Sequence, residues 1–278
     1  MTKTKVELGV VQETLLITLW ARATELLQPD PIICDRKSAE ILAAIDYDFS
    51  KFSNSKNSQI GCCLRGLILD NWVRDYLQEY PQGIVVEIGA GLNTRFERVD
   101  NGTVRWFDLD LPDAIALRKQ FFTETERCQI ITSSCLDTDY LYQVKEIQKQ
   151  LQFSDKPILF VAEGVLMYLS EQQVKLLFAN LLQVFPGCRI AFDSMSSLMV
   201  KNQKRHDSLK HTSAKFDWSI SNIRKIQEWD SRYQILEVCI FADLPAQYLR
   251  RYPYIQRFVF RYMPILRDSY RLSLLQLG

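Results

Sequence analysis

Apolar positions recur at helical spacing over the first eighty residues. In the run CCLRGLILDNWVRDYL, four apolar side chains fall at i, i+3, i+4 and i+8, on one face of a helix: Leu64, Leu67, Ile68 and Trp72. Pro81 and Gly83 follow this run and should end the helix. We therefore expect residues 1–80 to form a helical N-terminal region.

The pattern changes after residue 80, where short apolar runs alternate with longer amphipathic ones. The strand candidates are, in order, IVVEI, TVRWFDLD, CQIITSS, PILFVAEG and CRIAFDS. The runs DAIALRKQFF and SEQQVKLLFANLLQVF have helical character; Ser170 is placed to cap the second, and Pro186-Gly187 to end it. Alternating strands and helices predict an α/β fold with a mainly parallel sheet and helices on both faces.

The C-terminal part has a third pattern. YQILEVCIF and YIQRFVFRY resemble strands with no long helix after them, so we expect an antiparallel pair at the sheet edge. In the second run, strand spacing would turn the arginines to water and the aromatic rings to the sheet.

Charge and cysteine content narrow the class of protein. The 278 residues hold 34 Lys plus Arg and 33 Asp plus Glu, a balance that argues against general nucleic-acid binding. No apolar run approaches the roughly 20 residues of a membrane span, and the N-terminus lacks the pattern of a signal peptide. Seven scattered cysteines suit a reducing compartment better than a disulfide framework, and we expect no metal site. A cytoplasmic protein without membrane partners is predicted.

Three predicted strands end in residues that suit a nucleotide ligand. The ends are Gly89-Ala90-Gly91, Asp108 with Asp110, and Glu163-Gly164. In a parallel sheet, ligands bind beyond such carboxyl ends. The glycines could form only a tight turn, but the acidic neighbours favour a cofactor loop.

The spacing of the glycine turn bears on which nucleotide binds. Thr94 stands where the dinucleotide fingerprint G-x-G-x-x-G has its third glycine, which weakens an NAD site. No Gly-Lys-Ser/Thr follows, so a phosphate loop is excluded. Asp110, 110 − 89 = 21 residues after Gly89, could hold the ribose of either NAD or S-adenosylmethionine.

Five segments in order carry a family resemblance: ETLLITLWARATELLQPDPIICDRKSAEIL, GAGLNTR, WFDLDLPDAIALRKQFF, AEGVLMYL and AFDSMSSL. They resemble the leucine carboxyl methyltransferase family, and within it the bacterial tetracenomycin-type polyketide O-methyltransferases. The resemblance implies the class I (Rossmann-like) methyltransferase fold and S-adenosylmethionine as cofactor. It also implies a single domain with four parts: helical cap 1–80, cofactor-binding core 81–195, acceptor lid 196–230 and C-terminal strands 231–278.

The resemblance also assigns cofactor-binding residues. Arg65 matches the arginine that pairs with the methionine carboxylate, a task that suits its planar fork. The other matches are Gly89, Ala90 and Gly91 at the loop, Asp110 at the ribose, Cys135 and Leu136 beside the adenine, and Glu163 bordering the cofactor. Arg22 is either a second cation near that carboxylate or a solvated helix residue.

Two positions depart from the family pattern. Asn93 stands where aspartate is common after the glycines, and it keeps the size but not the charge. Cys135 stands where aspartate often lies beside the adenine, and a thiol is a poor acceptor for an amino group. Asp137, two residues on, could substitute.

The acceptor site is less determined by the sequence. Residues 195–215 hold five Lys/Arg and one Asp after the fifth strand, where the family places elements over the acceptor; they form either a basic lid or a solvated loop. Arg205 and Lys210 would contact an anionic acceptor in the first case. His206 or His211 is either a general base or a surface residue. Met167 and Tyr168 line either the pocket or the core.

We therefore predict a small-molecule O-methyltransferase that tailors a polyketide or peptide natural product. A carboxylate acceptor needs no base at pH 7 and is slightly favoured over a hydroxyl, which usually does. Two alternatives stay open: a protein C-terminal carboxyl methyltransferase, and a catalytically inactive cofactor-binding module.

Overall fold

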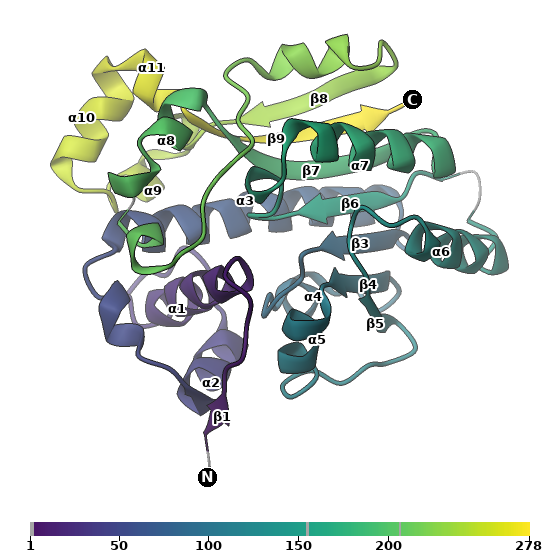
Figure 1. The fold of residues 1–278 in the computed structure, drawn as a ribbon, viewed down its shortest axis with the longest axis horizontal. Coiled ribbons are helices and arrows are strands. Elements are labelled where there is room, and N and C mark those ends of the chain that lie inside the picture. Colours follow the sequence, from purple (N-terminus) through teal and green to yellow (C-terminus); the bar gives the residue numbers. More distant parts are fainter. Residues whose placement is uncertain (1–2, 154–155, 206) are drawn as a thin grey trace.

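The structure is a computed structural model that describes residues 3–153, 156–205 and 207–278. Within them, seven strands form a central sheet in the order β5-β4-β3-β6-β7-β9-β8 (Figure 1). The strands are β3 (Ile84–Ile88), β4 (Arg105–Asp110), β5 (Cys128–Thr132), β6 (Leu159–Ala162), β7 (Cys188–Met195), β8 (Tyr233–Cys239) and β9 (Tyr270–Leu277). Strands β3 to β7 are parallel, and β9 runs antiparallel to both of its neighbours.

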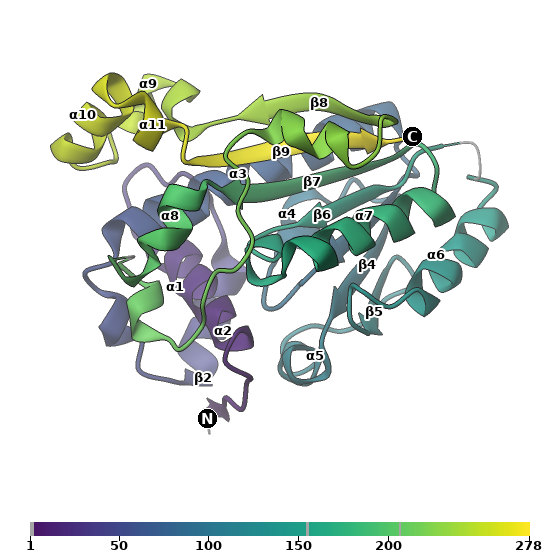
Figure 2. The same cartoon turned by 45° about the horizontal axis from the view of Figure 1, so that its top comes forward.

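Helices cover both faces of this sheet, as the alternating pattern predicts. One face packs on α6 (Asp139–Gln150) and α7 (Glu171–Val184), and the other on α3 (Lys56–Glu79) with α4 (Arg95–Val99) (Figure 2). In β3, Ile84, Val86 and Ile88 enter the first core while Val85 enters the second, so the strand is buried on both sides. The α/β prediction is confirmed.

Further helices close the carboxyl ends of the strands. Their bounds are α1 (Leu15–Glu25), α2 (Arg36–Ala44), α5 (Pro112–Arg118), α8 (Ser197–Lys201), α9 (Ala246–Leu249), α10 (Tyr254–Tyr262) and α11 (Pro264–Arg267). Single 3₁₀ turns occur at Gln12–Thr14, Phe49–Phe52, Leu166–Tyr168, Gln203–Arg205, Leu209–His211, Ile223–Glu228 and Phe241–Asp243. A two-residue parallel pair joins β1 (Thr4–Lys5) to β2 (Ile45–Asp46). The predicted cap of α7 is present. The Ser170 side chain accepts from Gln173 N–H, and Ser170 N–H donates to the Gln173 side chain.

The prediction of a strand in YIQRFVFRY is wrong. Residues Tyr254–Tyr262 form helix α10, which begins directly after Pro253. Proline cannot donate to a sheet ladder, and its fixed φ is suited to a helix start. The antiparallel pair is formed instead by β8 and β9, with α9, α10 and α11 between them in the chain. Strand β9 lies between β7 and β8 in the sheet.

Candidate cofactor and acceptor site

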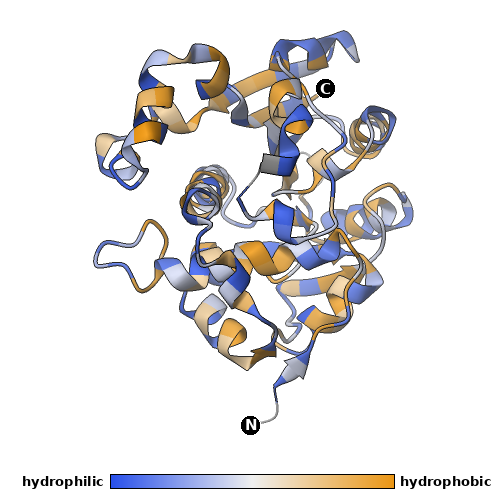
Figure 3. Ribbon diagram, turned by 60° about the vertical axis from the view of Figure 1, so that its left-hand side comes forward, coloured by the Kyte–Doolittle hydropathy of each residue, from blue (hydrophilic) through white to orange (hydrophobic). Residues whose placement is uncertain are grey.

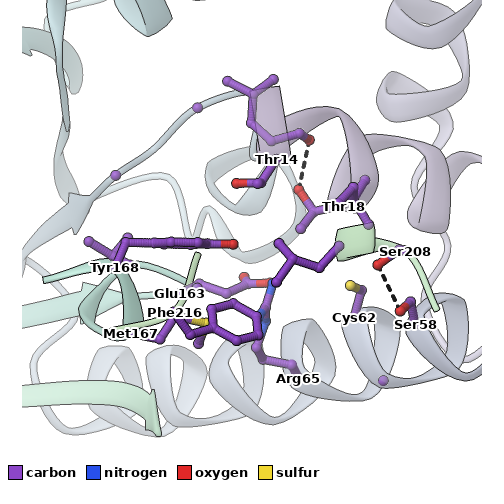
Figure 4. Close-up of a pocket in the computed structure, with 18 of the residues that line it drawn as sticks. Thr14, Thr18, Ser58, Cys62, Arg65, Glu163, Met167, Tyr168, Ser208 and Phe216 are labelled. Atoms are coloured by element: carbon purple, nitrogen blue, oxygen red, sulfur yellow. Dashed lines mark hydrogen bonds and ion pairs between the residues drawn. The ribbon is translucent and has the colours of Figure 1, made fainter. Parts of the chain in front are cut away.

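A pocket of about 600 Å³ opens beyond the carboxyl ends of β3, β4 and β6. Its walls come from α1, α3, the segment 195–216 and the helices between β8 and β9, so distant parts of the chain meet there. Figure 4 shows Arg65 and Glu163 deep in this pocket, beside Met167, Tyr168 and Phe216. Polar groups gather at the strand ends, and aromatic rings gather on the opposite side.

The turn after β3 requires glycine at two positions. Gly89 and Gly91 have φ angles of +69° and +45°, in the left-handed region that side chains disfavour. A Cβ at Gly89 would lie 2.3 Å from Val165 Cγ2, and one at Gly91 would lie 3.2 Å from Leu15 Cβ. Both glycines and Ala90 line the pocket. The backbone can therefore approach a ligand closely at this turn.

Two buried arginines donate hydrogen bonds to backbone carbonyls of this turn. Arg22 Nη2 donates to Leu92 O at 3.0 Å, while its Nε pairs with Asp35 at 3.0 Å. Arg118 Nη1 donates to Gly91 O at 2.9 Å and to Asn93 O at 2.8 Å. Arg22 is only 2% exposed, so its interpretation as a solvated helix residue is wrong. Arg118 was not predicted, because nothing in its local sequence marks it as a partner of the glycine turn.

Arg65 lies between two buried carboxylates. Its Nε donates to Glu163 Oε1 at 2.9 Å, and its Nη1 donates to Asp193 Oδ2 at 3.1 Å and to Tyr270 Oη at 3.2 Å. Burial alone would raise the pKa of Glu163, but Arg65 and Arg95 outweigh it and hold that pKa well below its usual range. Arg65 lines the pocket, and its Nη2 makes none of these bonds. It can therefore donate to a ligand carboxylate.

Asn93 joins two carboxylates that would otherwise repel each other. Its Nδ2 donates to Glu87 Oε1 at 2.9 Å and to Glu163 Oε2 at 3.1 Å. Arg95 binds both of these carboxylates as well. Burial raises the pKa of Glu87 to about 7 even with Arg95 beside it. An aspartate at position 93 would add a third negative charge here and would lose both bonds donated by Nδ2.

The two aspartates of β4 have different environments. Asp110 lines the pocket, and its Oδ2 accepts from Gly91 N–H at 2.7 Å. Burial raises its pKa above the usual range of an aspartate. Asp108 is instead buried against Trp106 Nε1, at 3.0 Å, and Arg118 Nη2, at 2.6 Å. Of these two aspartates, only Asp110 lines the pocket, and its role at the ribose stays a prediction.

The predicted adenine region is only partly in the pocket. Cys135 lines it together with Ser133 and Ser134, and burial raises the pKa of the Cys135 thiol to about 11. Leu136 packs against the core beneath α6 and α7 instead. Asp137 Oδ2 accepts from Ser133 Oγ at 3.0 Å and from Ser134 N–H at 3.1 Å, so its carboxylate is used to shape the loop. The residue pattern could not distinguish these orientations.

The other end of the pocket is aromatic. Three ring pairs line it, and their centroid separations are 5.4 Å for Tyr168–Phe216, 5.2 Å for Phe241–Tyr270 and 5.1 Å for Tyr252–Phe260. Offset and tilted pairs at such separations are favourable contacts. Met167 and Tyr168 line the pocket. Phe216 comes from the predicted acceptor lid 196–230, while the other four rings come from segments that the sequence did not assign to the pocket.

The described lysines do not form a basic lid. Met199, Leu209 and Phe216 of the segment 195–216 line the pocket, whereas Lys210 is exposed and is not among the lining residues. Lys201, Lys204 and Lys215 are exposed as well. The cause is local packing, because the apolar residues of this segment turn inward and leave the charges in water.

Neither predicted base is shown at the pocket. The His211 ring is exposed and lies 6.2 Å from the Phe52 ring, outside the set of lining residues. His206 lies outside the described residues, and the side chain of Arg205 is not described either. The segment is fixed to the start of α3, where Ser58 N–H donates to Asp207 Oδ2 at 3.2 Å and Ser55 Oγ donates to Asp207 O at 3.0 Å.

Comparison with known proteins shows the family of this chain. The model of the family "Leucine carboxyl methyltransferase" matches residues 16–182. This chain belongs to that family. It is 31% identical to the tetracenomycin polyketide synthesis O-methyltransferase TcmP of Streptomyces glaucescens over 96% of this chain and 97% of the relative. It is 28% identical to the S-adenosyl-L-methionine-dependent methyltransferase dpfgK of Gibberella zeae over 81% of this chain and 80% of that one.

Solved structures support the fold of this family member. A protein from Thermobifida fusca described as a methyltransferase superposes with a TM-score of 0.57 at 13% identity, covering 95% of this chain and 94% of the other. A DUF574 family protein from Streptomyces avermitilis gives 0.52 at 10% identity, covering 93% and 97%. The class I methyltransferase fold is confirmed, and the protein is an S-adenosylmethionine-dependent methyltransferase.

The residues of this methyltransferase fit that cofactor. Asp110 presents carboxylate oxygens at the end of β4, where a ribose diol would need acceptors. Arg65 Nη2, which makes none of the bonds given above, would donate to the methionine carboxylate, and the turn at Gly89 and Gly91 has no Cβ that would obstruct the ligand. Thr94 is fully buried and donates to Asp35 at 2.6 Å, so the residue in the third glycine position has a structural task.

Proposed function

We propose that this enzyme transfers a methyl group to an oxygen of a small, largely aromatic natural product, such as a polyketide. The observation that carries this is the aromatic end of the pocket, where six rings surround the space next to Arg65 and Glu163. Rings of this kind bind flat apolar molecules by burial and by stacking. The name of the Streptomyces relative, which refers to tetracenomycin polyketide synthesis, agrees with such an acceptor.

The chain's own groups would bind, orient and exclude water. Arg65 would hold the methionine carboxylate of S-adenosylmethionine, and Asp110 would hold its ribose diol. When bound, the cofactor supplies an electrophilic methyl group, and an aligned oxygen nucleophile needs little more than proximity and a dry site. The rings of Tyr168 and Phe216 would provide that dry wall on the acceptor side.

A carboxylate acceptor is favoured over a hydroxyl. Tyr168 and Cys62, which line the pocket, hold their protons, since burial raises the pKa of Tyr168 to about 12 and raises that of Cys62. Such groups are poor general bases at neutral pH, whereas a carboxylate arrives already ionised. His211 is exposed and does not line the pocket, so we expect it to be dispensable.

The alternatives are less well supported. A protein C-terminus would need a channel for an extended peptide, and six rings at the acceptor end suit a compact apolar molecule better. An inactive binding module was suggested by Asn93 and Cys135, but the bonds of Asn93 to Glu87 and Glu163 give that residue a role in the loop.

Within the described residues no helix is long and apolar enough to cross a membrane. We propose a cytoplasmic enzyme.

Two experiments test this function. In the first, thermal melting is followed with S-adenosylmethionine and with NADH; we expect stabilisation by the former only. In the second, transfer of labelled methyl from S-adenosylmethionine is measured to aromatic carboxylic acids, to phenols of matched size and to a peptide ending in leucine. Preferred transfer to the aromatic acids supports the proposal, and preferred transfer to the peptide contradicts it. A hundredfold fall in kcat for His211→Ala would move the assignment to hydroxyl methylation.

A further inference from the structure

Helices α10 and α11 carry a concentration of exposed apolar side chains. The C-terminal patch is defined as Tyr254, Ile255, Phe258, Tyr262, Met263, Ile265 and Leu266. Ile255 and Ile265 are 77% and 78% exposed. Figure 3 shows hydrophobic segments along α10 and α11, at the outer end of the molecule. The four patch residues of α10 fall at i, i+1, i+4 and i+8, on one side of that helix.

Arginines accompany this patch, and two of them form ion pairs: Arg251 with Glu25 and Arg267 with Asp268. Residues 244–267 contain five Arg and no Asp, Glu or Lys, in a chain whose net charge is only +1. Arg250, Arg257 and Arg261 are exposed. Arg257 and Arg261 lie 5.6 Å and 5.5 Å from the ring centroids of Tyr254 and Tyr262, so charge and apolar surface are interleaved.

The patch borders the acceptor end of the pocket. On the inner side of α10, Gln256 and Phe260 line the pocket, and Phe260 packs edge-on against Tyr252. Leu266 belongs both to the patch and to the pocket lining. Figures 1 and 2 show α10 and α11 beyond the ends of β8 and β9 at the periphery of the molecule, and the patch side chains are exposed there.

We propose that the C-terminal patch rests on an anionic lipid surface, with Ile255 and Ile265 entering the lipid boundary. Helices that lie in such a boundary carry apolar and aromatic residues on one face and basic residues beside them, as α10 does. The arginines provide the charge complement to acidic headgroups. A second copy of this chain fits less well, because a symmetric contact would bring the arginines of both copies together.

This contact would give an apolar acceptor a short route into the enzyme. Molecules with aromatic character partition into lipid, and the aromatic end of the pocket begins on the inner side of α10. The lipid contact itself does not depend on which molecule is methylated. It can therefore fail or succeed separately from the proposed function.

Vesicle sedimentation with the full-length protein tests the proposal. We expect it to bind vesicles of phosphatidylcholine mixed with phosphatidylglycerol, to bind pure phosphatidylcholine much more weakly and to dissociate at high salt. The double variants Ile255→Ser/Ile265→Ser and Arg257→Glu/Arg261→Glu should each lower the partition coefficient by about tenfold or more.

A matched control is Leu27→Ser/Leu176→Ser, which removes residues 81% and 49% exposed in other parts of the molecule and should leave binding unchanged. Thermal melting and S-adenosylmethionine titration establish that each variant is folded. Absence of binding by the unmodified protein overturns the proposal, as does an equal loss in the control. A dimer in sedimentation equilibrium that dissociates in Ile255→Ser/Ile265→Ser would assign the patch to a second copy instead.

Discussion

The two ends of the pocket are built by different physical means. At the cofactor end, buried ion pairs fix the geometry: Arg65 binds Glu163 and Asp193, and Arg95 binds Glu87 and Glu163. At the acceptor end, aromatic rings from several separate segments pack against one another. A charge network tolerates little change, whereas an apolar wall can be reshaped by exchanging side chains of similar volume. One end is thus suited to a fixed ligand and the other to a variable one.

The largest expected effect is at the boundary between these ends. Arg65→Ala should lower the free energy of unfolding by about 3–5 kcal/mol, because it leaves Glu163 and Asp193 buried without their partner. Urea unfolding measures this loss, and titration should show no S-adenosylmethionine binding. Lys56→Ala, at the exposed start of the same helix, is the control. A loss within about 1 kcal/mol would mean that the two ends are not joined by a charge network.

Asp110→Ala should weaken S-adenosylmethionine binding by about 1.5–3 kcal/mol, since a charged acceptor for the ribose is removed. Calorimetry measures this change, and the KM of the acceptor should stay constant. Asp108→Ala is the comparison, because Asp108 holds Arg118 and does not line the pocket. It should reduce stability more than affinity. A greater loss of affinity in Asp108→Ala would show that the ribose carboxylate has been wrongly assigned.

Asn93→Asp should cost about 1–3 kcal/mol of stability at pH 8, because it loses the two bonds donated by Nδ2 and adds a carboxylate. The pKa of Glu87 is raised to about 7 in the folded protein. A cluster of carboxylates around it therefore binds protons more tightly in the folded state than in the unfolded state. The deficit should therefore shrink as pH falls below 7. Asn71→Asp, which is exposed on α3, is the control. A deficit that grows in acid would contradict this account.

The smallest effect should come from the acceptor end. Phe216→Leu removes the ring contact with Tyr168 and should raise the acceptor KM by a factor corresponding to about 0.5–1.5 kcal/mol. The S-adenosylmethionine affinity should not change. Phe153→Leu, which loses a ring contact with Tyr80 outside the pocket, provides the matched control. An effect on cofactor affinity as large as that on KM would remove the distinction between the two ends.

The sequence predicted correctly those pocket residues that lie next to a recognisable strand in the chain. Gly89, Gly91, Asp110 and Glu163 lie at or just beyond the ends of strands, so a strand pattern and a local motif were enough to place them at the carboxyl ends of the sheet. The role of each as a cofactor ligand stays a prediction. Arg65 was found by family resemblance, since its spacing alone describes only a helix face.

The rest could not be predicted because it depends on tertiary contacts. Arg118 reaches the glycine turn from the end of α5, and Tyr270 reaches Arg65 from β9, without any local pattern that marks either. Lys210 was predicted in the pocket because its charge would suit an anionic acceptor. Leu209 beside it is buried and lines the pocket instead, which leaves the Lys210 side chain in solvent. In Tyr254–Tyr262, helical and strand spacings are both satisfied, and Pro253 together with the position of β9 favours the helix.

The placement of β9 between β7 and β8 has a consequence for the order of folding. Strand β8 joins the described sheet only by pairing with β9, which begins some thirty residues later in the chain. During synthesis, β8 therefore cannot join the sheet until β9 has left the ribosome. Phe241, Tyr252 and Phe260 lie between these strands in the chain, and so the acceptor wall is expected to close last. Pulse-labelled hydrogen exchange during refolding should protect the amides of β3 to β7 before those of β8. The cofactor half of this enzyme would then exist, briefly, as an intermediate without a place for an acceptor.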